Sequence, residues 1–172
     1  MKKIIITGGL GHIGSYLIRK ILKEKKHTHI IIIDNLSSQR LFSLFNLKKN
    51  GNKISFYDFD ITKKNITQIA QKSQMIIHLA AATDAERSLG KEKEYLENNL
   101  NGTKKVIEYA EKFNVPLIFP SSTSVYGKMK KNDILKEDDS DKLFPQSPYA
   151  KIKLSEEKII KDKLKKSKYA II

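Results

Sequence analysis

A glycine-rich turn that directly follows an apolar run is the feature that most constrains the fold of this chain. The run KIII, residues 3–6, precedes TGGLGHIGSYL, residues 7–17, and this segment holds four of the eight glycines in the chain. Gly9, Gly11 and Gly14 follow the spacing Gly-x-Gly-x-x-Gly. Glycine lets a turn take a positive φ and lets the backbone come close to a ligand. The segment therefore predicts a buried strand, a tight turn and a helix.

Apolar runs and helical patterns then alternate to the end of the chain. The predicted strands are Lys2–Thr7, His29–Ile33, Lys53–Phe56, Met75–Leu79, Pro116–Phe119 and Tyr169–Ile172. The predicted helical segments are His12–Leu22, Leu41–Leu47, Ile66–Ala70, Glu92–Phe113 and Pro148–Lys166, with a polar stretch over Gly127–Ser147. Such alternation predicts an α/β fold, a doubly wound parallel sheet of Rossmann type with helices on both faces. No repeat or linker divides the chain, so we expect one domain over residues 1–172.

The glycine turn has the context of a dinucleotide-binding site. A helix that begins near His12 offers unpaired N–H groups and a positive dipole end to a pyrophosphate, and Gly14 allows close packing of helix and sheet. Asp34 ends the second predicted strand, 20 residues after Gly14. A carboxylate there accepts hydrogen bonds from ribose hydroxyls and repels a 2′-phosphate, which predicts NAD as cofactor. Arg40 keeps NADP open as the alternative, and for the glycines alone a plain tight turn is the alternative.

Tyr149 and Lys153 stand four positions apart in the last predicted helix, so they share one helix face. The pKa of a free tyrosine is about 10, and a nearby ammonium favours the phenolate. The pair therefore predicts a tyrosine with a lowered pKa that accepts a proton from a sugar hydroxyl. An ordinary amphipathic helix face is the alternative for this pair taken alone.

Composition limits the partners of the chain. The net charge is +14, from 33 Lys and Arg against 19 Asp and Glu, but the lysines are spread through nearly every segment. No basic stretch carries interleaved aromatic residues for base stacking, and the run 158–168 is typical of a solvated helix face, so no nucleic-acid partner is expected. The longest aliphatic run, Ile30–Ile33, is too short for a membrane span. There is no cysteine, and His27 and His29 lack a metal-ligand pattern, so we expect no metal and a cytoplasmic location.

Seven motifs, in order along the chain, resemble the NAD-dependent epimerase/dehydratase family of extended short-chain dehydrogenases/reductases. They are TGGLGHIGSYL at 7–17, DNLS at Asp34–Ser37, DI at Asp60–Ile61, HLAA at His78–Ala81, NNLNGT at Asn98–Thr103, SSTSVYG at Ser121–Gly127 and PQSPYAKIKLSEE at Pro145–Glu157. The motifs cover essentially the whole chain. The resemblance implies a Rossmann-type domain that binds NAD, with a nucleotide sugar as substrate.

The resemblance also implies catalytic roles. Tyr149 would be the acid/base, and Lys153 would be its partner and a ligand of the nicotinamide ribose. Ser122 would hydrogen-bond the reacting sugar oxygen, with Ser124 as the alternative. Asn99 matches a helix asparagine that supports the site.

The cofactor-binding residues that the resemblance implies are Gly8, Gly11, His12, Ile13, Gly14, Asp34, Asn35, Asp60, Ile61, Ala80, Ala81, Tyr149 and Lys153. Asp60 and Ile61 would hold the adenine, and Ala80 and Ala81 would line the cofactor channel. His78, at the start of HLAA, is expected to be a packed histidine of a buried strand end.

Two departures from the family pattern shape the expected function. Thr123 and Ser124 replace the Asp-Glu pair that drives water loss in sugar-nucleotide dehydratases, which argues against dehydration. Family members continue past the sixth strand into a smaller substrate domain, and we expect this C-terminal domain to be absent from the chain.

The resulting prediction is the cofactor-binding portion of an NAD-dependent nucleotide-sugar epimerase, which passes hydride to NAD and back through a keto-sugar. The alternatives are a nucleotide-sugar oxidoreductase or dehydratase of the same family, and a non-catalytic NAD-binding fragment. The sixth predicted strand is an uncovered apolar edge, which also predicts association into a homodimer.

Overall fold

The computed structural model describes residues 1–84, 86–127 and 143–172, and its centre is a six-stranded sheet in which every pair of neighbours is parallel. The strands are β1 (Lys2–Thr7), β2 (Thr28–Asp34), β3 (Lys53–Asp58), β4 (Met75–His78), β5 (Leu117–Phe119) and β6 (Tyr169–Ile171). Their order in the sheet is β3-β2-β1-β4-β5-β6, the strand order of the Rossmann fold. The predicted fold class is therefore confirmed.

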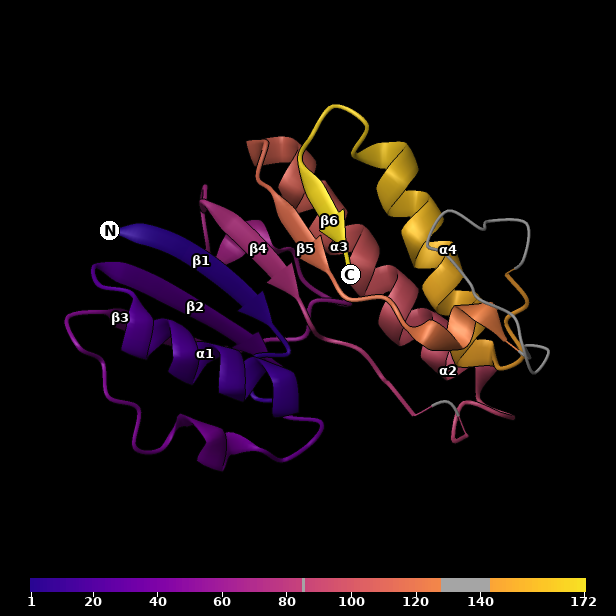
Figure 1. Cartoon of the computed structure of the whole chain (residues 1–172), viewed down its shortest axis with the longest axis horizontal. Helices are drawn as coiled ribbons and strands as arrows, with labels where there is room; N and C mark the ends of the chain where they lie inside the picture. The colour runs from indigo at the N-terminus through magenta and orange to yellow at the C-terminus, as the bar shows by residue number, and fades with distance from the viewer. Residues whose placement is uncertain (85, 128–142) are drawn as a thin grey trace, which may run out of the picture.

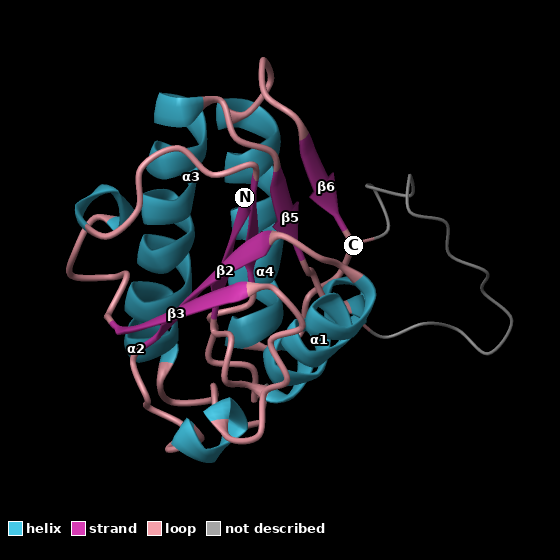
Figure 2. Cartoon of the chain, turned by 90° about the vertical axis from the view of Figure 1, so that its left-hand side faces the viewer, coloured by secondary structure: helices cyan, strands magenta, loops and turns pink. Residues whose placement is uncertain are grey.

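Helices cover both faces of the sheet (Figures 1 and 2). They are α1 (His12–Glu24), α2 (Glu92–Tyr95), α3 (Asn101–Phe113) and α4 (Pro148–Lys163). Strand β2 explains this arrangement, because successive side chains of a strand point to opposite faces. Ile30 and Ile32 pack with Ile18 of α1, whereas Ile31 and Ile33 belong to the core beneath α3 and α4. A continuous β-branched run is stable only when both faces of its sheet are buried.

The strands lie within two residues of their predicted positions, but the helical segments differ more. The segments predicted at Leu41–Leu47 and Ile66–Ala70 are short 3₁₀ turns, Leu41–Leu44 and Ile66–Gln68. A further 3₁₀ turn, Thr123–Tyr126, was not predicted. Helix α4 ends at Lys163, three residues before its predicted end. Of the predicted polar stretch, residues 128–142 lie outside the described part of the chain.

The long helix predicted over Glu92–Phe113 contains an irregular turn. Helix α2 passes through a π-helical turn, Leu96–Leu100, before it continues as α3. Apolar periodicity continues across such a turn, so the sequence pattern did not reveal it. Single π-turns inside helices are frequent at functional sites, and this one contains Asn99.

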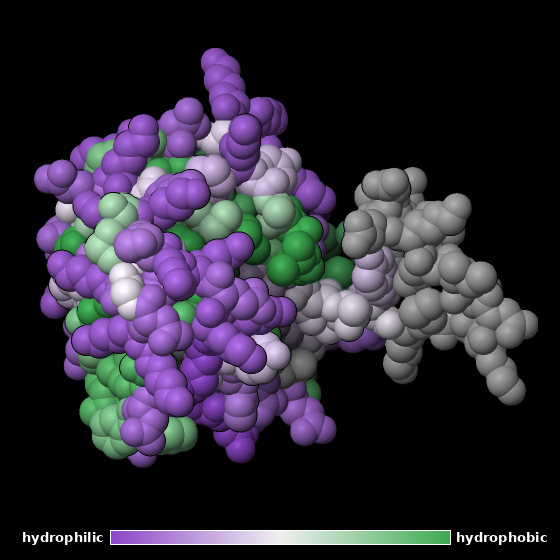
Figure 3. All heavy atoms as spheres, turned by 60° about the vertical axis from the view of Figure 1, so that its left-hand side comes forward, coloured by the Kyte–Doolittle hydropathy of each residue, from purple (hydrophilic) through white to green (hydrophobic). Residues whose placement is uncertain are grey.

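The view in Figure 3 shows a mostly hydrophilic surface with smaller hydrophobic areas, as expected for a lysine-rich chain whose charges are dispersed. Within the described ranges, no helix combines the length and apolar character that crossing a membrane requires. Those same ranges contain no group of three or more His, Cys, Asp or Glu side chains placed to hold a metal ion.

Strand β6 has an open edge among the described residues, and we expect the 172-residue chain to associate through it. The Lys168 carbonyl accepts from Leu117 N–H at 3.1 Å and Ile172 N–H donates to the Phe119 carbonyl at 3.0 Å, so these two residues face β5. The N–H of Tyr169 therefore faces the opposite, outer side. Tyr169→Pro should weaken association because it removes an outward donor without breaking a bond to β5.

Sedimentation velocity over a range of protein concentrations measures this association. The matched control is Tyr169→Thr, which keeps the N–H and the strand preference of the position. A parent chain that stays monomeric at every concentration would contradict the prediction.

Candidate functional site

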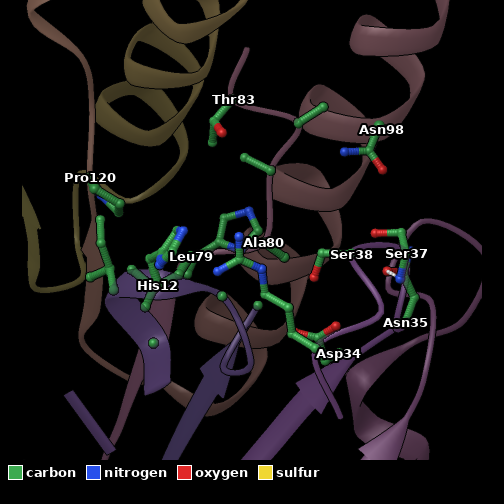
Figure 4. A pocket seen from close by; sticks show the side chains of 18 of the residues that line it. His12, Asp34, Asn35, Ser37, Ser38, Leu79, Ala80, Thr83, Asn98 and Pro120 are labelled. Carbon is green, nitrogen blue, oxygen red and sulfur yellow. Dashed lines mark hydrogen bonds between the residues drawn. The ribbon is translucent and has the colours of Figure 1, made fainter. Parts of the chain in front are cut away.

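One cleft of about 700 Å³ lies beyond the carboxyl ends of the strands. It forms where the sheet order reverses from β1 to β4, the position at which parallel α/β sheets bind their ligands. Figure 4 shows three labelled residues around this cleft: His12 follows β1 in the chain, Asp34 ends β2 and Ala80 follows β4. The predicted residues that line it are Gly8, Gly11, His12, Ile13, Gly14, Asp34, Asn35, Ala80, Ala81, Tyr149 and Lys153. The structure thus brings together most of the predicted cofactor-binding residues.

The glycines of the turn differ in how strictly the fold requires them. Gly8 has φ +65°, and a Cβ at this position would lie 2.5 Å from Ala80 N. A Cβ on Gly14 would lie 2.7 Å from the Gly8 carbonyl oxygen and from two backbone atoms of Gly9. At Gly11 the φ is −64°, and an added Cβ would come no closer than 3.3 Å to the Gly8 carbonyl. The fold therefore requires glycine at positions 8 and 14, whereas at position 11 the fold itself nearly tolerates a side chain.

Helix α1 begins at the cleft with unpaired donors. Its first backbone hydrogen bond runs from Ser15 N–H to the Gly11 carbonyl at 2.9 Å, so the N–H groups of residues 12–14 have no acceptor within the helix. Gly11 at the N-cap has no side chain to cap them, and the first turn carries no acidic residue. This end of the helix carries a partial positive charge, which suits a phosphate group. The cradle without side chains thus fits the pyrophosphate of a dinucleotide.

Asp34 is held in a fixed position at the cleft. Its Oδ2 accepts from Leu10 N–H at 3.1 Å and its Oδ1 accepts from Leu36 N–H at 3.0 Å. A carboxylate offers about four lone-pair sites, so two remain for the hydroxyls of a ligand. Arg40 lines the same cleft, so the acidic and the basic candidates for cofactor choice are both present.

Asn99 lies behind the wall of the cleft and not in it. Its side chain is fully buried in the π-helical turn, where Oδ1 accepts from Ala82 N–H at 2.8 Å and Nδ2 donates to the Ala82 carbonyl at 2.9 Å. These two bonds fix the segment after β4, whose residues Ala80 to Ala82 line the cleft. Asn99 is therefore placed to support the site through the backbone.

Tyr149 and Lys153 are both buried in the cleft wall, on one face of α4. Burial raises the pKa of the Tyr149 hydroxyl, a hydrogen bond with Ser122 opposes this rise, and the Glu156 carboxylate adds to it. The expected lowering of this pKa by Lys153 is therefore wrong. The physical reason is first the burial of the hydroxyl, which disfavours the charged phenolate; in addition, the Lys153 ammonium pairs with Glu156 Oε2 at 3.2 Å.

Lys153 has two further contacts besides Glu156. Its Nζ donates to the Pro120 carbonyl at 3.4 Å and lies 4.2 Å from the centre of the Phe119 ring. Burial lowers the pKa of Lys153, and the Glu156 carboxylate opposes that effect. Sequence reasoning missed Glu156, although its position three residues after Lys153 places it on the same helix face.

Ser122 does not line the cleft, but it acts on the pKa of the tyrosine at its wall. Its Oγ lies 2.8 Å from Ser124 Oγ and accepts from Ser124 N–H at 3.2 Å. The Ser122 hydroxyl, and not that of Ser124, lowers the pKa of Tyr149, which favours Ser122 as the partner of the tyrosine. The adjacent Ser121, which the sequence did not single out, lines the cleft and hydrogen-bonds Glu157.

Asp60 and Ile61 are not among the residues that line this cleft. Asp60 Oδ1 accepts from the N–H and the hydroxyl of Thr62, at 2.9 and 2.7 Å, and Asp60 also pairs with Lys63. Ile61 is part of the hydrophobic core. Their assignment to the adenine stays a prediction.

His78 is a packed histidine, as predicted. It is 2% exposed and its ring nitrogens contact the hydroxyls of Thr7 and Thr103 at 2.6 and 3.0 Å. Burial, with a smaller effect of Lys153, lowers the pKa of His78 to about 3, so the ring is neutral at physiological pH.

A doubly wound parallel sheet, a glycine cradle where its strand order reverses and a buried Tyr-x-x-x-Lys pair at the same cleft define a Rossmann-type domain of the short-chain dehydrogenase/reductase class. A match to a family model identifies the particular family. The chain belongs to the NAD dependent epimerase/dehydratase family, which it matches over residues 4–172.

Individual relatives are similar over nearly the whole chain. UDP-glucose 4-epimerase uge1 of Schizosaccharomyces pombe is 31% identical over 171 residues, which cover 96% of this chain and 48% of that protein. The UDP-N-acetylglucosamine 4-epimerase of Methanobrevibacter ruminantium M1, solved with UDP-N-acetylmuramic acid, has a TM-score of 0.85 at 31% identity and covers 99% of this chain and 53% of its own. A Bacillus cereus UDP-glucuronic acid 4-epimerase variant, solved with a fluorinated UDP-sugar and NAD, has a TM-score of 0.84 at 28% identity. The match covers 98% of this chain and 55% of that one. The chain therefore spans about half the length of the relatives it matches.

Proposed function

We propose that this chain is the cofactor-binding portion of an NAD-dependent nucleotide-sugar epimerase, with residues 1–172 as one NAD-binding domain. The observation that carries the proposal is that a single cleft unites the glycine cradle, the Asp34 carboxylate and the Tyr149–Lys153 pair. The naming of its relatives as 4-epimerases of UDP-sugars supports the choice of reaction and of substrate class.

The cleft residues fit the parts of NAD. The turn from Gly8 to Gly14 and the N-terminus of α1 would hold the pyrophosphate, and Asp34 with Asn35 would hold the adenosine ribose. Ala80 and Ala81 would line the channel toward the nicotinamide, and Lys153 would contact its ribose. When bound, NAD supplies the acceptor and later the donor of a hydride.

The chain's own groups would handle the proton. Tyr149 would take the proton of the sugar hydroxyl as that carbon is oxidised, and would return it when the carbon is reduced again from the other side. Ser122 would hold the reacting oxygen through a hydrogen bond, and Asn99 would keep the cleft wall in place through Ala82. Tyr149 and Lys153 are almost fully buried in this wall, which would limit the access of water to the proton transfer.

Two observations bear on the alternatives. The turn that follows Ser122 carries Thr123 and Ser124 and no carboxylate, which favours epimerisation or oxidation over loss of water. The chain spans about half the length of its relatives, so NAD binding and turnover are tested separately. Reduction of NAD by a nucleotide sugar, measured as described in the Discussion, separates the catalytic from the non-catalytic alternative. A cytoplasmic location and a homodimer remain predictions.

The chain should bind NAD at least tenfold more tightly than NADP. This difference corresponds to about one hydrogen bond to a charged group. Asp34 would accept ribose hydroxyls in NAD, whereas a 2′-phosphate would meet its buried carboxylate. Calorimetric titration of the chain with each cofactor measures the ratio. Asp34→Asn should lower the preference because it removes the charge that repels the phosphate, and Arg40→Gln is the matched test of the competing basic residue. Equal or tighter binding of NADP by the parent would reject the role of Asp34.

A further inference from the structure

We propose that Glu156 is a positioning residue, which holds Lys153 at the cleft and is itself held by a directed chain of buried hydrogen bonds that runs through α3, β4 and β1 to the wall of the same cleft. The proposal rests on the proposed function, because it assigns Lys153 to the bound nucleotide. It concerns a residue outside the Tyr-x-x-x-Lys pair, and it predicts the protonation state of each member of the chain.

The first half of this hydrogen-bond chain joins α4 to α3. Glu156 is 1% exposed, its Oε2 lies 3.2 Å from Lys153 Nζ, and its Oε1 accepts from Thr103 Oγ1 at 2.5 Å. A carboxylate so deeply buried is stable only where charge and hydrogen bonds compensate it. Lys153 supplies the charge through an ion pair with Oε2, and Thr103 supplies the hydrogen bond to Oε1, whereas Oε2 has no hydrogen-bond partner among the described residues.

The second half continues across β4 and β1. Thr103 Oγ1 lies 3.0 Å from His78 Nε2, and His78 Nδ1 lies 2.6 Å from Thr7 Oγ1. Thr7 Oγ1 accepts from Ala80 N–H at 3.3 Å. Because Ala80 lines the cleft, the hydrogen-bond chain that starts at Lys153 returns to the same cleft.

The direction of every hydrogen bond follows from the two ends. Ala80 N–H can only donate, so Thr7 Oγ1 accepts there and its own hydrogen is free for His78 Nδ1. At the other end ionised Glu156 can only accept, so Thr103 donates to it and accepts from His78 Nε2. His78 must therefore carry a hydrogen on Nε2, and with Thr7 donating to Nδ1 the ring is the neutral tautomer.

The electrostatic environment agrees with this assignment. Burial and the charge of Lys153 hold the pKa of His78 at about 3, so the ring stays neutral as the hydrogen-bond chain requires. The Phe119 ring packs against both groups, with its centre 6.0 Å from the His78 ring centre and 4.2 Å from Lys153 Nζ. The ammonium is thus fixed by Glu156, a backbone carbonyl and an aromatic face, and its position depends on the ionised carboxylate.

The tautomer of His78 in the unaltered chain is the first test. Imidazole nitrogen NMR of the ¹⁵N-labelled chain distinguishes the two neutral tautomers, and His78→Gln identifies the signal among those of the four histidines. We expect the hydrogen on Nε2 and no titration between pH 5 and pH 8, roughly the range in which an ordinary histidine ionises. A hydrogen on Nδ1, or titration of this ring in that range, would overturn the proposal. This measurement needs no cofactor, so it stands even if the proposed function fails.

Glu156→Gln is the second test, because an amide keeps the shape but has one oxygen and one NH₂ group. If its oxygen faces Lys153, the NH₂ group donates to Thr103, the released Thr103 hydrogen is donated to His78 Nε2, and we expect the hydrogen of His78 on Nδ1. If its oxygen faces Thr103, the NH₂ group meets the ammonium and Lys153 must leave its position. We therefore expect a changed His78 tautomer or NAD affinity reduced about tenfold, the strength of one hydrogen bond to a charged group.

The matched control is Glu157→Gln, which makes the same charge change one residue further along α4. Glu157 bonds Ser121 and Lys161 and has no bond to Thr103, so the His78 tautomer should not change. A folded Glu156→Gln chain that keeps both the tautomer and the NAD affinity of the parent would overturn the proposal. A parent chain that does not bind NAD would instead contradict the proposed function.

Thr103→Val provides a further test if Glu156→Gln does not fold. It removes the donor to Glu156 Oε1 but leaves the ion pair with Lys153, and Thr103→Ser restores the hydroxyl. We expect Thr103→Val to bind NAD more weakly than the parent and Thr103→Ser to bind it equally well. Equal affinity for all three folded chains would overturn the positioning role.

Discussion

Tyr149→Phe should slow hydride transfer from a nucleotide sugar to NAD by about 10²–10⁴-fold, the usual contribution of a general acid–base group. The substitution keeps the ring that packs with Tyr95 and Ile152 and removes only the hydroxyl. NAD affinity and thermal stability should therefore stay close to those of the parent chain. The loss should appear in the chemical step alone.

The measurement is a single-turnover reduction of bound NAD, followed by the absorbance of NADH. Because the chain spans half the length of its relatives, it is fused to the C-terminal half of a UDP-glucose 4-epimerase and compared with the same fusion carrying each variant. Burial raises the pKa of Tyr149, so the reactive phenolate fraction, and with it the parent rate, should increase with pH. The Tyr149→Phe fusion should lack this increase.

Ser122→Ala should have a smaller effect on the rate than Tyr149→Phe. It removes a hydrogen bond that lowers the pKa of Tyr149, so the pH profile should move to higher pH with a smaller loss of rate than in Tyr149→Phe. A Tyr149→Phe fusion that reacts at the parent rate would remove the basis for an epimerase mechanism. The non-catalytic NAD-binding alternative would then describe the chain better.

Gly11→Val should reduce NAD affinity by about 100-fold or more while the chain stays folded. The φ of −64° at Gly11 is open to any residue, and an added Cβ meets only the Gly8 carbonyl oxygen, at 3.3 Å. The new side chain would instead occupy the cradle in which N–H groups face the pyrophosphate. Each hydrogen bond to a charged group is worth about 1.5–3 kcal/mol, so losing one or two accounts for the effect.

Gly14→Ala is the opposite case within the same turn. Its Cβ would lie 2.7 Å from three backbone atoms, so the turn must move and the free energy of unfolding should fall by about 1–3 kcal/mol. Calorimetric titration with NAD and thermal unfolding, applied to both variants, separate the two effects. A Gly11→Val chain that binds NAD like the parent would show that the pyrophosphate lies elsewhere.

Part of this protein was predictable because the information is local in the chain. The β-branched runs predict buried strands wherever they occur, and their alternation with helical patterns leaves few topologies other than a doubly wound parallel sheet. In that topology the residues just after the strands must meet at one edge of the sheet. Gly8 and Asp34 could therefore be assigned to one site from sequence, the family resemblance added Ala80, and the cleft contains all three.

The tertiary structure alone decided what those residues contact. The sequence determined a strand, a glycine cradle and a Tyr-x-x-x-Lys pair, because each depends on the spacing of neighbouring residues. The partner of Lys153 and the pKa of Tyr149 depend instead on how α3 packs between α4 and β4, which brings Thr103 and His78 toward Glu156. Such packing joins residues more than 50 positions apart, and their burial, not their spacing, sets the charges and hydrogen bonds at the site.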